Sequence, residues 1–156
     1  MSPAELVAAL LKSGNLVATA ESCTGGMVAA AITDIAGSSA IFDRGFVTYS
    51  NAAKSQMLGV PPKLIEAHGA VSEAVARAMA EGALKHSAAT LTIAITGIAG
   101  PTGGSDTKPV GLVHFGCALK SSKTWHECVI FSGDRAAIRI AARDHALYML
   151  GMALKG

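Results

Sequence analysis

The spacing of apolar positions changes several times along the chain, between the period of two that is typical of strands and the period of 3.6 that is typical of helices. Short apolar or β-branched runs predict strands, and amphipathic stretches that begin at a polar capping residue predict helices. The expected strands are Leu16–Ala20, Phe42–Ser50, Leu91–Thr96, Val110–Leu119 and Thr124–Ser132. The expected helices are Pro3–Lys12, an alanine-rich helix after Gly26 that ends near Ile35, a short helix from Asn51 to Gly59, a helical turn at Pro61, and the longer helices Ser72–His86 and Asp134–Leu154.

Capping signals mark several of these helix starts. Ser2 and Glu5 have the spacing of a capping box, with a proline at the first helical position between them. Asn51 and Asp134 are the expected N-caps of the short helix and of the last helix. We expect residues 1–156 to form a single α/β domain, in which a mixed, mostly parallel sheet is covered by helices on both faces as a three-layer sandwich.

Composition limits how such a chain packs and what it binds. Hydrophobic residues make up 51% of the sequence, but many of them are alanines, and 17 glycines accompany them. Because each small side chain buries little area, the core must depend on close approach of backbones. The net charge is +2 and no basic stripe is present, which argues against nucleic acid as a partner. The low charge, together with Arg135, Arg139 and Arg143 spaced four residues apart on the last helix, predicts a homo-oligomer.

The location of the protein is predicted from segments that the sequence lacks. The most apolar windows, Leu16–Ala20 and Leu91–Ile95, are far shorter than the ~20 residues that span a bilayer, so no membrane association is expected. The first residues lack the basic lead and small-residue cleavage site of a secretory signal. Cys23, Cys117 and Cys128 are an odd number of cysteines without a Cys-x-x-Cys pair, which is typical of the reducing cytoplasm. We therefore expect a cytoplasmic protein.

Motif searches exclude several enzyme classes. The five histidines have no metal-ligand spacing such as His-x-x-x-His, so no metal site is expected. The glycine-rich loop Gly97–Gly104 lacks the Gly-Lys-Ser/Thr ending of a P-loop and does not open a helix, so it is not a nucleotide-binding turn of either common kind. No Gly-x-Ser-x-Gly elbow occurs. These absences favour chemistry without a metal or another cofactor.

The turn Glu21–Gly26 is the first segment whose residues suggest catalysis. Ser22 and Cys23 lie where a predicted strand ends and a helix begins, so backbone N–H groups and the positive helix end face any charge that develops there. A nucleophile in this place has an oxyanion hole beside it. The Ser22 hydroxyl and the Cys23 thiol are both candidates. Alternatively, Ser22 or Thr24 only caps the helix and the glycines allow tight packing.

A second candidate segment follows the strand that ends at Ser50. If Asn51 caps the short helix, Lys54 falls in the first helical turn, where the helix dipole disfavours a cation, and its side chain points back towards Tyr49. A partly buried amine there has a lowered pKa, which suits a neutral general base for a serine, and Tyr49 can relay or hold the proton. Alternatively, Lys54 is solvated and Tyr49 packs at a sheet edge.

Two further patterns have simpler interpretations. Ser105 and Lys108 have the Ser-x-x-Lys spacing of serine acylases, but they lie in a loop rich in glycine and proline, which favours a lid or an anion contact. Arg135, Arg139 and Arg143 are four residues apart and share one helix face. Such a row can meet a phosphate, although an exposed or subunit-facing row is more usual.

Five blocks of the sequence, taken together, resemble the CinA C-terminal domain family, whose enzymatic members are nicotinamide-nucleotide amidases. The blocks are ATAESCTGG, DIAGSSAIFDRGFVTYSNAAKSQMLGV, HGAVSE, ITGIAGPTGGSDTKPVG and FSGDR. The resemblance covers about Glu5–Leu150 and implies a cytoplasmic bacterial α/β domain that hydrolyses the carboxamide of nicotinamide mononucleotide, giving nicotinate mononucleotide and ammonia without a metal. Longer members carry an additional N-terminal domain, for which 156 residues leave no room.

The resemblance also implies roles for single residues. Ser22 of the Glu-Ser-Cys-Thr-Gly-Gly block corresponds to the nucleophile, and Tyr49 and Lys54 of the Tyr-Ser-Asn-x-x-Lys block correspond to its partners in acyl transfer. The residues implied to contact the nucleotide substrate or the oxyanion are Thr24, Gly25, Gly26, Thr96, Gly97, Gly100, Gly103 and Gly104. Two alternatives are a non-catalytic nucleotide-binding or partner-binding module of the same fold, and an amidohydrolase that acts on another small amide.

Overall fold

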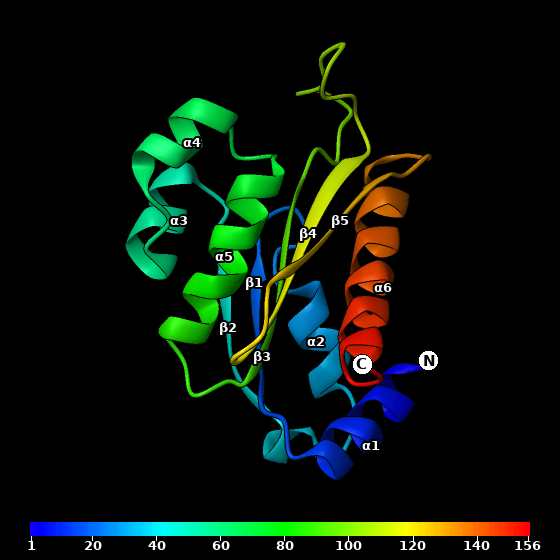
Figure 1. The fold of residues 1–156 in the computed structure, drawn as a ribbon. Coiled ribbons are helices and arrows are strands. Elements are labelled where there is room, and N and C mark those ends of the chain that lie inside the picture. Colours follow the sequence, from blue (N-terminus) through cyan, green and yellow to red (C-terminus); the bar gives the residue numbers. More distant parts are fainter.

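Five strands form one sheet, and six α-helices flank it, in the computed structural model of residues 1–156 (Figure 1). The strands are β1 (Val17–Glu21), β2 (Phe42–Val47), β3 (Leu91–Gly97), β4 (Leu112–Leu119) and β5 (Trp125–Ile130). The helices are α1 (Pro3–Ser13), α2 (Met27–Thr33), α3 (Asn51–Leu58), α4 (Pro62–His68), α5 (Glu73–Lys85) and α6 (Arg135–Ala153), with a 3-10 turn η1 (Ser38–Ala40). Every strand and helix expected from the sequence is present, and the turn expected at Pro61 is the helix α4.

The strand order in the sheet is β2-β1-β3-β4-β5. The connections from β1 to β2 and from β2 to β3 contain helices, and these three strands are parallel neighbours. The links after β3 and β4 contain no helix, and β4 is antiparallel to both of its neighbours. The expected mixed α/β sheet is confirmed, and two of its four strand pairings are parallel.

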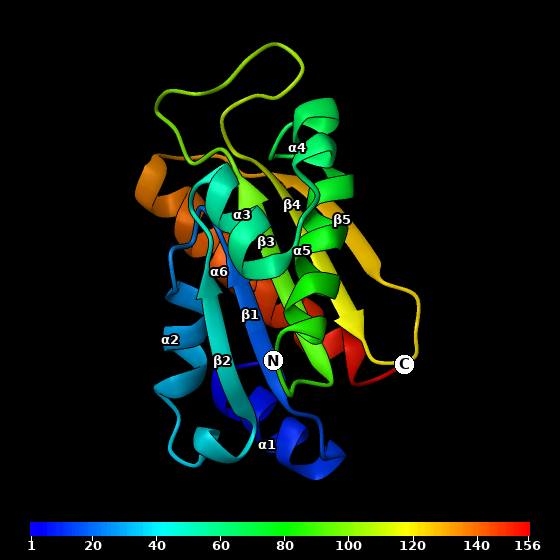
Figure 2. The same cartoon turned by 90° about the vertical axis from the view of Figure 1, so that its left-hand side faces the viewer.

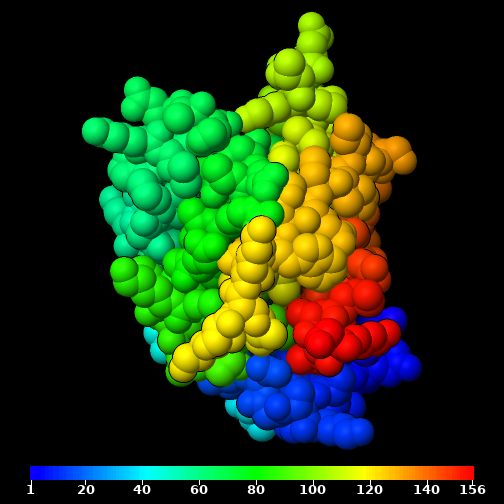
Figure 3. Space-filling view, viewed as in Figure 1, coloured from blue at the N-terminus to red at the C-terminus, as the bar shows by residue number.

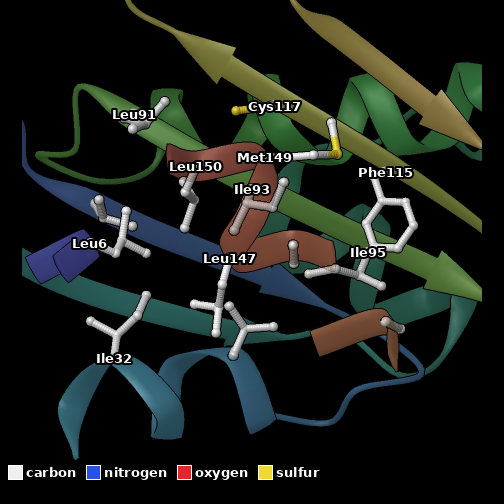
Figure 4. Close-up of a cluster of buried hydrophobic side chains, with 14 of the residues drawn as sticks. Leu6, Ile32, Leu91, Ile93, Ile95, Phe115, Cys117, Leu147, Met149 and Leu150 are labelled. Atoms are coloured by element: carbon white, nitrogen blue, oxygen red, sulfur yellow. The ribbon is translucent and has the colours of Figure 1, made fainter. Parts of the chain in front are cut away.

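Helices cover both faces of the sheet, which confirms the three-layer arrangement (Figures 1 and 2). The helices α1, α2 and α6 lie on one face, where Ile93 of β3 packs with Leu147 and Leu150 of α6 in the larger apolar cluster (Figure 4). The helices α3, α4 and α5 lie on the other face, over a smaller cluster that contains Ala20 and Ala94 of the central strands. Alternation along the strands therefore gives one face large side chains and the other face small ones.

Glycine and alanine allow α5 to approach the sheet closely. A Cβ at Gly116 of β4 would overlap the backbone carbonyl of Ala76 in α5. A Cβ at Gly82 of α5 would overlap the carbonyl of Leu58 at the end of α3. At these two positions any larger residue forces the backbones apart, so part of the small-residue content is a packing requirement.

The helix starts agree with the capping predictions except at α3. The capping box of Ser2 and the cap at Asp134 are present. At α3 the cap is Ser50, whose hydroxyl oxygen accepts from the N–H of Ala53, so the prediction that Asn51 caps this helix is wrong. Ser50 has the extended backbone that an N-cap needs. The strand β2 ends at Val47, three residues before the expected end at Ser50.

The longest irregular segment, residues 98–111, joins β3 to β4 and projects beyond the end of the sheet (Figures 1 and 2). In the space-filling view it stands out from the top of the molecule (Figure 3). Residues 101–107 of this loop are all exposed. None of the helices is both long enough and apolar enough to cross a bilayer.

Candidate active site

The carboxyl ends of β1, β2 and β3 lie side by side at one end of the sheet, because these strands are parallel neighbours (Figure 2). A pocket of about 190 Å³ opens beside them. Its lining consists of Ser22, Cys23, Tyr49, Asn51, Lys54, Ala70, Val71, Thr96, Gly97, Ala99 and Arg135. A larger hollow of about 370 Å³, with residues of α3 and α4 in its lining, shares Asn51 with this pocket but holds no buried serine or lysine. Ligand sites at the carboxyl ends of parallel strands are common in α/β folds.

Lys54 is the unusual group in this pocket, because it is only 1% exposed and pairs with no carboxylate. Its Nζ lies 3.1 Å from Ser22 Oγ, 2.9 Å from the Thr48 carbonyl oxygen and 3.4 Å from the Tyr49 carbonyl oxygen. A neutral amine can donate its two N–H groups to the carbonyl oxygens and accept the hydroxyl proton of Ser22 on its lone pair. Burial lowers the pKa of Lys54 and so favours this neutral form.

Local structure explains how Lys54 reaches this place. The Ser50 cap starts α3 directly after β2, and Lys54 is the fourth residue of the helix. Helical side chains lean towards the N-terminus of their helix, so the amine extends back to the end of β2. The direction expected from the sequence agrees with the contacts to the carbonyl oxygens of Thr48 and Tyr49.

Ser22 is held where β1 leads into the turn before α2. It is 8% exposed, and its backbone N–H donates to the carbonyl oxygen of Ile95 on β3. Gly25 and Gly26 have φ of 57° and 103°, which lets the chain turn sharply within a few residues. The N–H of Cys23 donates to no other residue's carbonyl oxygen. This N–H group lies next to Ser22 and is the candidate donor to an oxyanion in this turn.

The positive end of α2 is already occupied, which corrects the expectation that it faces the reacting charge. The buried carboxylate of Glu21 accepts the N–H of Val28 at 2.9 Å and the N–H of Ala29 at 3.1 Å. These are first-turn donors of α2, so they are not available to a substrate. An oxyanion in this segment must therefore be stabilised by backbone N–H groups of the turn that precedes α2.

The Tyr49 hydroxyl contacts an arginine and not the serine or the lysine. Tyr49 is 64% exposed, and its hydroxyl oxygen accepts from Nη2 of Arg135 at 3.2 Å. Nη1 of the same guanidinium donates to the Gly100 carbonyl oxygen at 2.8 Å. Only the backbone carbonyl of Tyr49 reaches Lys54. The expected proton relay through the Tyr49 hydroxyl thus has no direct contact in this structure.

The other substrate-contact residues implied by the sequence divide into two groups. Thr96 and Gly97 line the pocket, and the Thr96 hydroxyl donates to the carbonyl oxygen of Ala70, which also lines it. The residues that do not line it are Thr24, Gly25, Gly26, Gly100, Gly103 and Gly104. Gly103 and Gly104 belong to the exposed part of the 98–111 loop, and Gly100 takes part only through its carbonyl contact with Arg135.

Several lining residues were not expected from the sequence. Ala70 and Val71 lie in the block HGAVSE, and Arg135 is the last residue of the block FSGDR. These lining residues were therefore contained in the blocks that resemble the family. The arginine row itself is not one functional unit. Arg139 donates to the carbonyl oxygens of Cys23 and Thr24, and Arg143 pairs with its neighbour Asp144.

Cys23 is a poor nucleophile in this environment. Its side chain is buried, and burial raises the pKa of its thiol to about 11. At neutral pH the group is therefore a thiol, whereas nucleophilic attack requires the thiolate. Ser22, whose hydroxyl contacts a buried amine, is the stronger candidate.

The Ser-x-x-Lys pair in the long loop is a turn and not a second catalytic pair. The Lys108 N–H donates to the Ser105 hydroxyl oxygen at 3.1 Å, and Nζ of Lys108 donates to the carbonyl oxygen of His68 at 2.6 Å. This lysine therefore fastens the loop to the C-terminal end of α4. No group of three or more His, Cys, Asp or Glu side chains is placed to hold a metal ion.

Known proteins resemble this chain over nearly its whole length. "Nicotinamide-nucleotide amidohydrolase PncC" of Shigella flexneri is 56% identical over 153 residues, which cover 96% of this chain and 92% of that protein. A "Putative competence-damage inducible protein" of Symbiobacterium thermophilum is 52% identical over 155 residues, which are 94% of this chain but only 36% of that protein.

Solved structures also resemble this chain over nearly its whole length. The "competence/damage inducible protein CihA" of Agrobacterium tumefaciens superposes with a TM-score of 0.92 at 47% identity, covering 99% of this chain and 96% of that one. A "Competence-Damaged Protein (CinA) Superfamily Protein" of Klebsiella pneumoniae 700603 also has a TM-score of 0.92, at 38% identity and 99% coverage of both chains. The model of the CinA C-terminal domain matches residues 2–154. This chain belongs to the CinA C-terminal domain family.

Proposed function

We propose that the protein hydrolyses the carboxamide of nicotinamide mononucleotide to nicotinate mononucleotide and ammonia, with Ser22 as nucleophile and Lys54 as general base. The observation that carries this proposal is the 3.1 Å contact between Ser22 Oγ and the buried amine of Lys54 in a pocket at the sheet end. Relatives at 54–56% identity over most of the chain bear the name nicotinamide-nucleotide amidohydrolase, which supports the choice of substrate.

The chemistry proceeds in two acyl-transfer steps. The lone pair of neutral Lys54 takes the Ser22 hydroxyl proton while Oγ attacks the amide carbon, and the Cys23 N–H stabilises the oxyanion of the tetrahedral intermediate. The Lys54 ammonium then returns the proton to the leaving nitrogen, so the C–N bond breaks and ammonia departs. Water attacks the resulting ester while Lys54 takes one of its protons. The Lys54 ammonium then gives this proton to Ser22 Oγ as the ester C–O bond breaks, which releases the acid and restores the Ser22 hydroxyl.

Arg135 is the group best suited to hold the phosphate of such a substrate. The pocket lining contains no acidic side chain, and its two basic residues are Lys54, which acts as a neutral amine, and Arg135. Two guanidinium N–H groups are used by the Gly100 carbonyl and the Tyr49 hydroxyl, which leaves the others for an anion. A guanidinium held in this way matches a phosphate with two parallel hydrogen bonds. Tyr49 then serves to orient Arg135.

The purified protein is expected to release ammonia and nicotinate mononucleotide in equal amounts from nicotinamide mononucleotide, in a buffer that contains a metal chelator. Coupled ammonia detection and chromatography of the nucleotide measure the two products. Nucleotide binding in calorimetry without any turnover would contradict this proposal and favour a non-catalytic binding module.

Arg135→Met is expected to raise KM for nicotinamide mononucleotide by about 10-fold to 100-fold, because a charge-assisted contact to the phosphate contributes about 1.5–3 kcal/mol. Nicotinamide riboside, which lacks the phosphate, is the matched substrate, and its kcat/KM should change by less than about threefold. Steady-state kinetics with both substrates test this. Equal losses for the nucleotide and the riboside would assign Arg135 to the structure of the pocket and not to phosphate binding.

A further inference from the structure

Glu21 is a buried carboxylate that the proposed reaction does not use. It is 1% exposed and forms no ion pair. Its two oxygens are bonded to the N–H groups of Val28 and Ala29, in the first turn of α2. A carboxylate buried without a cation is costly, and here only backbone donors and the positive helix end compensate its charge.

The backbone of the turn explains why the cap of α2 comes from upstream. The N-cap position is Gly26, whose φ of 103° is rarely adopted by residues with a side chain, so no local serine or aspartate can cap the helix. Glu21 takes this role from the last position of β1. Its carboxylate therefore spans the turn that contains Ser22, with the sheet at one end and the helix at the other.

The backbone of Glu21 also connects the two groups of the proposed reaction. Its carbonyl oxygen accepts the N–H of Thr48 at 2.9 Å, and the carbonyl oxygen of Thr48 in turn accepts from Lys54 Nζ at 2.9 Å. The next residue after Glu21 is Ser22. The nucleophile is thus the covalent neighbour of Glu21, and the base is connected to Glu21 through Thr48 by two hydrogen bonds.

We propose that Glu21 is a positioning residue, which fixes the turn so that Ser22 Oγ stays within hydrogen-bond reach of Lys54 Nζ. This inference rests on the proposed function for the roles of Ser22 and Lys54. Loss of the bidentate cap lets α2 and the turn shift against the end of β2. A shift of about 1 Å at a nucleophile is enough to lower its reactivity by about a hundredfold.

The test uses Glu21→Gln, which keeps the size of the side chain but cannot accept both N–H groups, and Glu21→Asp, which keeps the charge but is one methylene shorter. Ser2→Ala is the matched control, because it removes the cap of α1 at the opposite end of the sheet (Figure 1). Each variant is measured for Tm, for kcat and KM with nicotinamide mononucleotide, and for the rate at which a small fluorophosphonate phosphonylates Ser22 Oγ with release of fluoride.

We expect Glu21→Gln to lower kcat and the phosphonylation rate by at least about tenfold, with KM changed by less than about threefold. Ser2→Ala should lower Tm but neither rate. A smaller loss in Glu21→Gln, or an equal loss in Ser2→Ala, would overturn the proposal. If Glu21→Gln does not fold, Glu21→Asp is judged by the same limits. Failure of both to fold would make Glu21 a requirement of the fold alone and would also overturn the positioning role.

The two readouts separate this inference from the proposed function. If the wild-type protein is phosphonylated at Ser22 but does not hydrolyse nicotinamide mononucleotide, the proposed substrate is wrong and the labelling rates alone decide the role of Glu21. If the wild-type protein hydrolyses the nucleotide and Glu21→Gln does so at the same rate, only the positioning role is wrong. If wild type shows neither reaction, both proposals are wrong.

Discussion

Ser22→Ala is expected to lower kcat for nicotinamide mononucleotide by about 10⁴-fold or more. The alanine variant has no atom that can form the acyl-enzyme, and catalytic groups that act as a unit lose most of the rate enhancement when one is removed. The hydroxyl is small and lies beside the pocket, so the loss should not be caused by unfolding. Ammonia release measured over hours, together with Tm, gives the magnitude and checks the fold.

Cys23→Ala is the control for this variant, because Cys23 is the adjacent residue and the rival nucleophile. We expect it to retain kcat within about fivefold of the wild-type value, since the thiol is protonated at neutral pH and only its backbone N–H takes part in the mechanism. Substantial activity in Ser22→Ala, or complete loss in Cys23→Ala, would transfer the role of nucleophile to the cysteine.

Lys54→Arg is expected to lower kcat by about 10³-fold, near the middle of the range for loss of a general base. A guanidinium stays charged at any working pH and cannot accept the proton of Ser22. Lys54→Met tests the same role without added bulk, because its unbranched side chain fits the buried space. Retained activity in both variants would exclude Lys54 as the base, whereas loss in the arginine variant alone would indicate steric obstruction.

The pH dependence of the wild-type rate gives an independent check on Lys54. The active form of Lys54 is the neutral amine, so kcat should fall as the pH is lowered through the pKa of this group. Because burial lowers that pKa from the ordinary lysine value of 10.5, the fall should lie below pH 10.5. The residual rate of Lys54→Met should not show it. An identical acidic limb in Lys54→Met would assign the titration to another group.

Much of the secondary structure was predictable because local signals decide it. The capping box at Ser2 and the cap at Asp134 were predicted at the right residues. The failure at α3 shows the limit of such signals, because Ser50 and Asn51 are both good caps and the choice depends on which residue leaves the strand in an extended conformation. The start of α2 at Met27 agrees with the helix expected after Gly26, but its capping group, the carboxylate of Glu21, was not predicted.

The candidate site was predictable where one segment carries both the residue and the reason for its placement. A lysine four residues after the helix cap must lean back to the end of the preceding strand, and Lys54 does so. Its contact with Ser22 joins residues 32 positions apart and depends on β1 and β2 becoming parallel neighbours. The contact of Arg135 with Tyr49 joins residues 86 positions apart, and no periodicity along the chain indicates it.

The sequence by itself determined the order of the elements, the layered α/β class and the segments that carry the reactive side chains. These depend on hydrophobic periodicity, on capping and on turn residues, which act over a few positions. The tertiary structure alone decided which groups meet. In it, the Lys54 amine contacts the Ser22 hydroxyl, the Tyr49 hydroxyl contacts Arg135, and the Glu21 carboxylate caps the N-terminus of α2. Such contacts depend on strand order and on the burial of each group, and both arise only when the whole sheet is assembled.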